Sequence, residues 1–477
     1  MAFYCAIGLY LLLFIAAALR SQPLRWIVPA VGFAAVAAVL AYTPLVLIRF
    51  PLNTRLIAQR IGFQGVVSFT ENASARVLQV DQRYLMGGSP GFVTKRMGDL
   101  AMLLAPAPRR LLYLGVGTGI TASAALAYPV ERVTGVELLP EILDMLPWFD
   151  QFNGGLRHDA RVVLHASDAR RFILVTPDRY DLIVADLYHP SRDGTGALYT
   201  VEHFDHVRSR LRHGGIFVQW LPLYQLRPHD LKTIVRTFLA VFPNAYSMLG
   251  NYSGSARFAL IGAAPGYAGI DVPMAEALIA KQTGQDKVFD GLHDLLASFM
   301  LDDAGLRNYS GVGPVNTDGN QRITFDAARG ARLDDGAARD RSLATLLPYR
   351  RLFPGSFIRV AGPGGLDALQ ESVRPYAAAL AQYLTAEILR AEPNASTDQV
   401  LAEYLTAYRL DGRFTLAAGK LLELSLAQPG AAREMVERIW LAHPAQPDFD
   451  RLHERLKNAA PENVRAVISR FLRSGGE

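Results

Sequence analysis

Residues 111–119 read Leu-Leu-Tyr-Leu-Gly-Val-Gly-Thr-Gly, an apolar run that leads directly into three alternating glycines. The apolar run predicts a buried strand of a parallel sheet, and the Ala-rich residues 120–127 predict a helix. Glycines between a strand and a helix let the backbone approach a ligand closely and leave the first helix amides free. The segment therefore predicts a nucleotide-binding turn, with an ordinary connecting turn as the alternative.

The same strand and helix alternation continues along the chain. Further strands are predicted at 133–136, 161–164, 180–185 and 216–220, with a helix at 202–211 and a Gly214-Gly215 turn before the last strand. Repeated units of this kind predict an open parallel sheet of the Rossmann type, with its ligand at the carboxyl ends of the strands.

An acidic residue follows each of three successive predicted strands. Glu137 comes about 20 residues after the glycine turn, where an acid can accept hydrogen bonds from both ribose hydroxyls. Asp168 is placed to meet an adenine amine, although it also directly precedes a helical stretch and could be an N-cap. Asp186 ends the next strand. Because Ile120 interrupts the G-x-G-x-x-G dinucleotide fingerprint, the pattern favours an S-adenosylmethionine-type nucleoside over NAD.

The first fifty residues predict a transmembrane hairpin. Residues 2–19 and 26–48 carry no charge and are separated by a polar break that contains two arginines. At about 1.5 Å per residue, the first stretch spans roughly 27 Å as a helix, close to the ~30 Å hydrocarbon core. A cleaved signal peptide is the alternative, but no Lys or Arg precedes the first stretch and a second stretch follows.

The charge distribution indicates the orientation of this hairpin and the kind of partner. Arg49, Arg55 and Arg60 follow the second stretch, which favours a cytoplasmic body. The net charge of +5 comes without a run of five like charges, so no nucleic-acid partner is expected. A single cysteine excludes a disulfide framework and a Cys-rich zinc site. No metal is expected, and homo-oligomerisation stays open.

We predict five segments from these patterns. They are a transmembrane hairpin at 1–50, a small β unit at 58–104, a Rossmann-like adenosyl-binding domain at 105–265, a mixed extension at 266–345, and an α-helical region at 346–477. The last region is broken near 392–394 and 428–430, and it could contain helical repeats.

Residues 63–262 resemble the spermidine/spermine synthase (polyamine aminopropyltransferase) family, most closely its bacterial membrane-fused branch. The resemblance is carried by short motifs at 112–119 (Leu-Tyr-Leu-Gly-Val-Gly-Thr-Gly), 135–137 (Gly-Val-Glu), 168–169 (Asp-Ala), 180–186 (Tyr-Asp-Leu-Ile-Val-Ala-Asp), 196–200 (Gly-Ala-Leu-Tyr-Thr) and 316–318 (Asn-Thr-Asp). It implies a class I methyltransferase-type sheet.

The resemblance also implies a reaction. In the family, decarboxylated S-adenosylmethionine donates an aminopropyl group to the diamine putrescine. The base of that reaction corresponds to Asp186, and Tyr188 and His189 would shape the amine pocket. The nucleoside would be bound by the glycine turn and the acids that follow it, namely Gly115, Gly117, Thr118, Gly119, Glu137, Asp168 and Ala169. Tyr188 could equally be a packing aromatic, and His189 a turn residue before Pro190.

The chain departs from the family at several acidic positions. Thr118 stands where an acid is usual in the glycine turn, and His189 replaces the second acid of Asp-x-x-Asp-Pro. The Leu-Asp-Gly-x-x-Gln element lacks its glutamine near 80–85, and residues 93–95 lie about where Tyr-His-Glu is expected. Fewer acids attract a dication less strongly, so the identity of the amine stays open.

Three functions are compatible with these residues. The first is a membrane-anchored aminopropyltransferase that uses decarboxylated S-adenosylmethionine and a small-molecule amine. The second is a methyltransferase that uses S-adenosylmethionine on the same fold, and the third is a non-catalytic, membrane-tethered protein that binds adenosyl compounds or polyamines. Retention of Asp186 favours the first over the third, whereas the loss of the other acids points the opposite way.

Overall fold

The computed structural model describes residues 53–73, 75–81, 84–88, 91–192, 194–252, 256–283, 287–333, 338–360, 364–392 and 394–425. The predicted transmembrane hairpin lies outside these residues. Within them, no helix combines the length and the apolar character needed to cross a bilayer. Contacts divide the chain into two units, 1–56 and 57–477.

The central sheet has eight strands, in the order β13-β10-β11-β9-β8-β5-β6-β7. Along the chain these are β5 (Arg110–Leu114), β6 (Arg132–Glu137), β7 (Val162–Ala166), β8 (Tyr180–Ala185), β9 (Leu211–Pro222), β10 (Tyr246–Leu249), β11 (Arg257–Ala263) and β13 (Phe299–Leu301). Strands β5 to β9 pair in parallel, and β11 runs antiparallel to β9 and β10. This mixed, mostly parallel order is the Rossmann-like arrangement of class I methyltransferases.

The strands form where apolar residues are buried on both faces of the sheet. Leu111 to Leu114 are all fully buried in β5, as are Leu182 to Ala185 in β8. Their continuous apolar runs predicted buried parallel strands, and the structure confirms this. The Gly214-Gly215 prediction was wrong in detail, because these glycines lie inside the longer strand β9. The pairing of β8 with β9 shifts register between Tyr180 and Leu182, opposite this part of β9.

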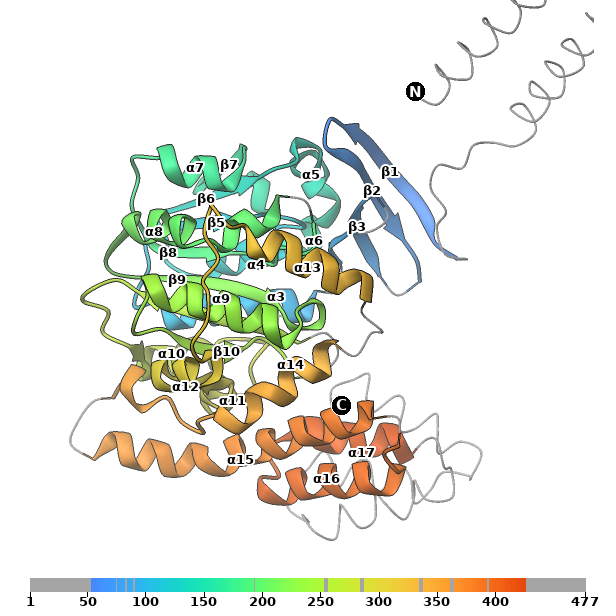
Figure 1. Ribbon diagram of the computed structural model, residues 1–477, viewed down its shortest axis with the longest axis vertical. Coiled ribbons are helices and arrows are strands. Elements are labelled where there is room, and N and C mark those ends of the chain that lie inside the picture. The colour runs from blue at the N-terminus through green and yellow to red at the C-terminus, as the bar shows by residue number, and fades with distance from the viewer. Residues whose placement is uncertain are drawn as a thin grey trace, which may run out of the picture. The chain divides into compact units, whose positions relative to one another are not determined.

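Helices connect and cover the strands (Figure 1). They include α3 (Phe92–Leu104), the short α4 (Ile120–Ser123), α5 (Pro140–Met145), α7 (Ala169–Val175), α8 (Val201–Ser209) and α9 (Pro228–Val241). A 3-10 turn, Ala124–Ala127, extends α4, so the predicted helix at 120–127 is helical throughout. Helix α3 contacts both α4 and β8, which places it beside the glycine turn.

A small antiparallel sheet precedes the central sheet in the chain. It contains β1 (Arg55–Gly62), β2 (Gly65–Glu71), β3 (Arg76–Val80) and β4 (Tyr84–Gly88) in sequential order. Its apolar face packs on the segment from α5 onward, where Phe69 meets Phe149 edge to face at 5.2 Å between ring centroids. The sequence predicted a small β unit at 58–104, and the structure has a four-stranded sheet followed by α3 within that range.

The remaining helices lie toward the C-terminus. They are α10 (Val272–Ile279), α11 (Leu292–Ala297), α12 (Asp303–Ser310), α13 (Arg322–Leu333), α14 (Ala338–Leu346), α15 (Gly365–Ala391), α16 (Thr397–Leu410) and α17 (Thr415–Ser425). The predicted break near 392–394 separates α15 from α16. Ser396 and Gln399 form a reciprocal capping box that begins α16.

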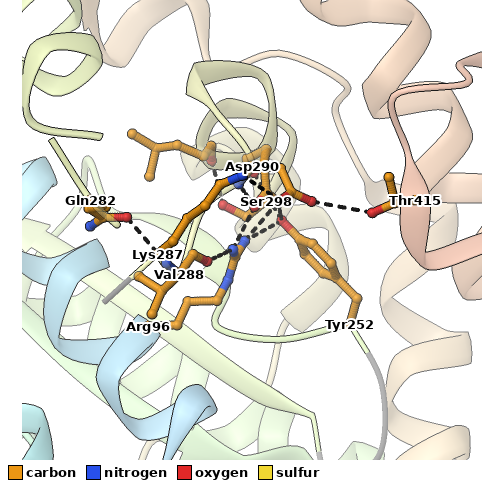
Figure 2. A network of polar contacts seen from close by, with 10 residues as sticks. Arg96, Tyr252, Gln282, Lys287, Val288, Asp290, Ser298 and Thr415 are labelled. Atoms are coloured by element: carbon orange, nitrogen blue, oxygen red, sulfur yellow. Dashed lines mark hydrogen bonds and ion pairs between the residues drawn. The ribbon is translucent and has the colours of Figure 1, made fainter. Parts of the chain in front are cut away.

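A buried polar network joins α3 to this C-terminal region (Figure 2). The Arg96 guanidinium donates to both carboxylate oxygens of Asp294 on α11, at 2.7 and 2.9 Å, and to the Tyr252 hydroxyl at 2.7 Å. It also donates to the Val288 carbonyl at 2.6 Å. Arg96 and Asp294 are 4% and 5% exposed, so this is a bidentate ion pair inside the protein.

Candidate active site

A cavity of about 280 Å³ lies at the carboxyl ends of strands β5, β6 and β8. Its wall comes from the glycine turn, the strand ends, α3, the start of α7 and the segments 187–192 and 194–198. The predicted site residues that line it are Gly115, Gly117, Glu137, Asp168, Ala169, Asp186, Tyr188 and His189. The structure therefore brings together residues that are far apart in the chain, as the strand-end argument predicts.

The glycine turn has the backbone geometry that glycine permits. Gly115, Gly117 and Gly119 have φ angles of +88°, +53° and +78°, a region where a side chain would strain the backbone. A Cβ atom on Gly119 would also come within 2.9 Å of the Leu156 side chain. The turn thus exposes bare backbone to the cavity at Gly115 and Gly117.

Thr118 and Gly119 are not among the cavity-lining residues. The Thr118 side chain is buried and faces Gly87 of β4, and its carbonyl accepts a hydrogen bond from the Asn153 amide at 3.0 Å. Gly119 is the N-cap of α4. Both residues therefore support the turn on the side away from the cavity. Contact of either with a nucleoside stays a prediction.

Glu137 is 3% exposed and supports the glycine turn directly. Its Oε2 accepts from the backbone amides of Val116 and Gly117, each at 3.1 Å, and its Oε1 accepts from Leu139 N at 3.1 Å. A carboxylate oxygen can accept two hydrogen bonds, so Oε1 keeps capacity for a ribose hydroxyl. Glu137 can both organise the turn and bind a sugar.

Asp168 is the N-cap of α7. Its Oδ1 accepts from the backbone amide of Arg171 at 2.8 Å, which is the capping role considered from the sequence. The side chain is exposed and also lines the cavity, next to Ala169 at the first position of the helix. The cap fixes the carboxylate at the cavity wall, and an adenine contact stays a prediction.

Asp186 directly follows β8 and faces the glycine turn. Its Oδ1 accepts from Leu187 N at 2.8 Å and its Oδ2 from the Thr121 hydroxyl at 3.3 Å. Burial raises the pKa of Asp186 to about 6, with a further small rise from the Glu137 charge, while these hydrogen bonds and Arg257 oppose the shift. A carboxylate that titrates near neutral pH is suited to accept a proton in catalysis.

Tyr188 and His189 line the cavity beside Asp186. The Tyr188 hydroxyl donates to the Leu114 carbonyl at 2.9 Å, and its ring meets Tyr199 edge to face. A His189 ring nitrogen lies 2.7–2.9 Å from the Gln225 side-chain amide. Tyr188 therefore has both the packing role and the cavity role that the sequence left open.

Several cavity residues were missed by the sequence reasoning. Tyr224 and Arg257 line the cavity from the turn after β9 and from the start of β11, and Thr94 and Met97 line it from α3. Tyr224, Arg257 and Met97 belong to no local motif, whereas Thr94 lies about where the family's Tyr-His-Glu element is expected. Only the sheet topology could have indicated Tyr224 and Arg257. An antiparallel strand such as β11 begins at the edge of the sheet where the neighbouring parallel strands end.

The Asn316-Thr317-Asp318 motif positions the cavity wall. The Asn316 side-chain amide donates to the carbonyls of Gly196 and Tyr199, at 3.1 and 3.0 Å, and so holds the segment that lines the cavity. Asp318 pairs with Arg170, which is itself a lining residue. The motif thus positions residues that line the cavity and does not line it itself.

Comparison with known proteins agrees with this arrangement. Residues 91–254 match the family model of the spermine/spermidine synthase domain. The chain is 30% identical over 172 residues to the polyamine aminopropyltransferase of Saccharolobus islandicus, covering 35% of this chain and 57% of that protein. It is 30% identical over 173 residues to polyamine aminopropyltransferase 1 of Pseudomonas aeruginosa, covering 36% of this chain and 60% of that protein.

The match over residues 91–254 and the two relatives support the resemblance to the spermine/spermidine synthase family that the motifs carried. The chain spans less than two thirds of the length of these two relatives. Among solved structures, the spermidine synthase from Thermotoga maritima matches with a TM-score of 0.44 and 20% identity, over 54% of this chain and 88% of that protein.

Proposed function

We propose that this protein is a membrane-anchored, spermidine synthase-like aminopropyltransferase that uses decarboxylated S-adenosylmethionine and a small-molecule amine. The observation that carries the proposal is the position of Asp186 in the cavity. Its carboxylate shares one cavity with the glycine turn and Glu137, and its pKa of about 6 leaves it mostly ionised at neutral pH.

The residues present fit the adenosyl group of this donor. Bare backbone at Gly115 and Gly117 allows close approach, Glu137 Oε1 has room for a ribose hydroxyl, and the exposed Asp168 carboxylate can meet an exocyclic amine. This placement directs the reactive end of the donor toward Asp186, at the adjacent strand end.

The chemistry assigned to Asp186 is proton acceptance. An alkyl amine has a pKa near 10.4, so its ammonium form must lose a proton before nitrogen can attack. Asp186 takes that proton, the nitrogen bonds to the propyl carbon beside the sulfonium, and the carbon–sulfur bond breaks. The electron pair stays on sulfur, so the sulfonium becomes the neutral thioether methylthioadenosine.

Analysis of the thioether product tests this proposal. Methylthioadenosine is expected when purified protein is incubated with decarboxylated S-adenosylmethionine and a panel of amines. The order of the sheet strands equally suits a methyltransferase, which would instead release adenosylhomocysteine from S-adenosylmethionine. Adenosylhomocysteine would replace the proposal with that reaction. Absence of both products would favour the non-catalytic binding protein.

We predict that Glu137→Ala weakens the binding of adenosyl ligands at least about tenfold. The change removes a charge-assisted acceptor for ribose, and each such hydrogen bond contributes roughly 1.5–3 kcal/mol. It also frees the Val116 and Gly117 amides that Glu137 holds. Calorimetry with methylthioadenosine measures the change, and unchanged affinity in a folded variant would contradict the ribose assignment.

We also propose that residues 2–19 and 26–48 anchor the protein in a bacterial inner membrane, with a cytoplasmic body. The support is the absence of charge in both stretches and the arginines that follow them. We predict that the full chain stays in the membrane pellet after extraction with alkaline carbonate. Release of intact protein into the supernatant would refute the anchor, and protease protection in sealed vesicles reports the orientation.

A further inference from the structure

One side of the cavity is formed by a short 3-10 turn, Thr195–Tyr199, which we call the wall turn. Thr195, Ala197 and Leu198 of this turn line the cavity. A turn of this length satisfies few of its own carbonyls, so the others need partners from elsewhere in the protein. The position of the wall turn therefore depends on the side chains that bind those carbonyls.

Asn316 binds two of these carbonyls from outside the turn. Its side-chain amide donates to the carbonyls of Gly196 and Tyr199 at 3.1 and 3.0 Å. Its Oδ1 accepts from Ile323 N at 3.2 Å, and its backbone carbonyl accepts from Val201 N at 3.0 Å. Because Asn316 is fully buried, loss of its side chain would leave these partners unsatisfied inside the protein.

The support of the wall turn comes from outside the part of the chain that matches the family model. Helix α13 packs directly on Gly196, since a Cβ atom there would lie 2.5 Å from the Thr324 backbone nitrogen. Asp318 pairs with Arg170, whose guanidinium donates to the Ala197 carbonyl at 2.9 Å. The segment that precedes and begins α13 therefore holds the wall turn in place.

The wall turn reaches Asp186 through Tyr188. The Tyr199 hydroxyl donates to the Tyr188 carbonyl at 3.3 Å, and the two rings meet edge to face, 6.3 Å between centroids. A Cβ atom on Gly115 would lie 3.5 Å from both Tyr188 Cε1 and Asp186 Cβ, so these two side chains are neighbours. Burial is the main cause that raises the pKa of Asp186 to about 6. Displacement of the wall turn would admit water to Asp186 and lower that pKa.

We propose that Asn316 is a positioning residue of the active site. Its side chain fixes the wall turn from behind, and the wall turn keeps Tyr188 beside Asp186 and closes that side of the cavity to water. Asn316 does not line the cavity, so it acts through the wall turn. The inference rests on the proposed function, because Asp186 is the group that the wall turn serves.

Asn316→Ala tests this role in transfer. Transfer is expected to slow at least about tenfold, because a displacement of about 1 Å near the reacting atoms can cost roughly 10²-fold. The acidic limb of the pH profile should move to lower pH by at least about half a unit, since a hydrated Asp186 ionises more readily. A limb that stays near pH 6 in a folded variant would overturn the inference.

Gly196→Ala displaces the wall turn without changing Asn316. The added methyl group would clash with α13, whereas the φ angle of Gly196 is not positive and suits alanine. This variant should also transfer more slowly and shift the limb to lower pH, and it tests the inference if Asn316→Ala does not fold. A folded Gly196→Ala protein with the rate and the limb of wild type would refute the role of the wall turn.

Asn153 offers a matched control. It is also fully buried and donates to two carbonyls, those of Thr118 and Leu146, at 3.0 and 3.3 Å, but it supports the glycine turn. Asn153→Ala should weaken methylthioadenosine binding and leave the acidic limb near pH 6. If both asparagine variants shift the limb alike, the shift reflects a general loss of packing and the inference is wrong.

Two readouts do not depend on activity. Hydrogen exchange followed by mass spectrometry should show faster exchange of the amides of 195–201 in full-length Asn316→Ala, and unchanged exchange there would overturn the inference. The gain in melting temperature from Asp186→Asn at pH 7.5 should fall by about half or more in the Asn316→Ala background, because the carboxylate is then less desolvated. If wild type forms no methylthioadenosine, the proposed function fails, and these two measurements still decide whether Asn316 positions the wall turn around Asp186.

Discussion

Asp186→Asn is expected to lower aminopropyl transfer by about 10²–10⁴-fold while changing adenosyl affinity little, because the amide keeps the shape of the carboxylate and cannot accept the proton. The amide oxygen can still accept from Leu187 N, and the amide nitrogen can still meet the Thr121 hydroxyl. Single-turnover rates of methylthioadenosine release measure the effect. Transfer at the wild-type rate in the variant would refute the mechanism and leave the fold unaffected.

The pH dependence gives an independent check on the same residue. A base with a pKa of about 6 must be ionised to act, so wild-type transfer should fall as the pH drops through about 6. The residual rate of Asp186→Asn should lack this acidic limb. Thr121→Val is a matched control, because it removes one hydrogen bond to Asp186 but keeps the base, and it should shift the limb to higher pH.

Asp186 should also lower the stability of the protein at neutral pH. The carboxyl pKa rises from 3.8 in the unfolded chain to about 6 in the folded protein, so the folded state binds the proton more tightly. The contribution of this group to the free energy of unfolding is therefore greatest below pH 4, and it is lost as the pH rises through 6. At pH 7.5, Asp186→Asn should have a higher melting temperature than wild type, and its free energy of unfolding should be larger by up to about 3 kcal/mol. This difference in free energy should shrink toward pH 4.

The nucleotide half of the site could be predicted because its signals are local. Continuous apolar runs predicted β5 and β8, and parallel strands place their carboxyl ends at one edge, so Glu137 and Asp186 had to lie near the glycine turn. Asp168 shows the limit of that reasoning. Its position was predicted, but the sequence could not distinguish a helix cap from a ligand, and the side chain both caps α7 and lines the cavity.

Asp186, Tyr188 and His189 of the amine half were predicted, but Tyr224 and Arg257 could not be, because they join the cavity only through tertiary structure. Tyr224 and Arg257 reach the cavity because β11 is antiparallel, and no periodic pattern around residue 257 announces that direction. The same holds for the contact of Arg96 with Asp294, which are 198 residues apart in the chain. In the sequence alone, Arg96 and Asp294 look like ordinary charged surface residues of helices.

Arg96→Leu is expected to destabilise the protein by about 3–5 kcal/mol, the largest stability effect that we predict. The change leaves the Asp294 carboxylate buried without its counter-charge, and Tyr252 and the Asp290 amide are the neighbours that still donate to it. The variant also loses the stacking of the Arg96 guanidinium on the Phe289 ring. In the wild type the central carbon of the guanidinium lies 4.1 Å from the centroid of that ring. Denaturant unfolding followed by tryptophan fluorescence measures the loss.

Two further variants test why Arg96→Leu loses stability. They distinguish the burial of an unpaired charge from the loss of an ion pair of any kind. Arg109 and Glu131 form a pair of similar length, 2.8 Å, but are 64% and 54% exposed, so Arg109→Leu should change stability by less than about 1 kcal/mol. The double variant Arg96→Met/Asp294→Leu removes both buried charges and should recover much of the stability lost in Arg96→Leu. If the double variant is as unstable as the two single losses combined, the two charges are not coupled, and the loss in Arg96→Leu does not come from an unpaired buried carboxylate. Because Thr94 and Met97 flank Arg96 on α3 and line the cavity, Arg96→Leu should also weaken methylthioadenosine binding, whereas Arg109→Leu should not.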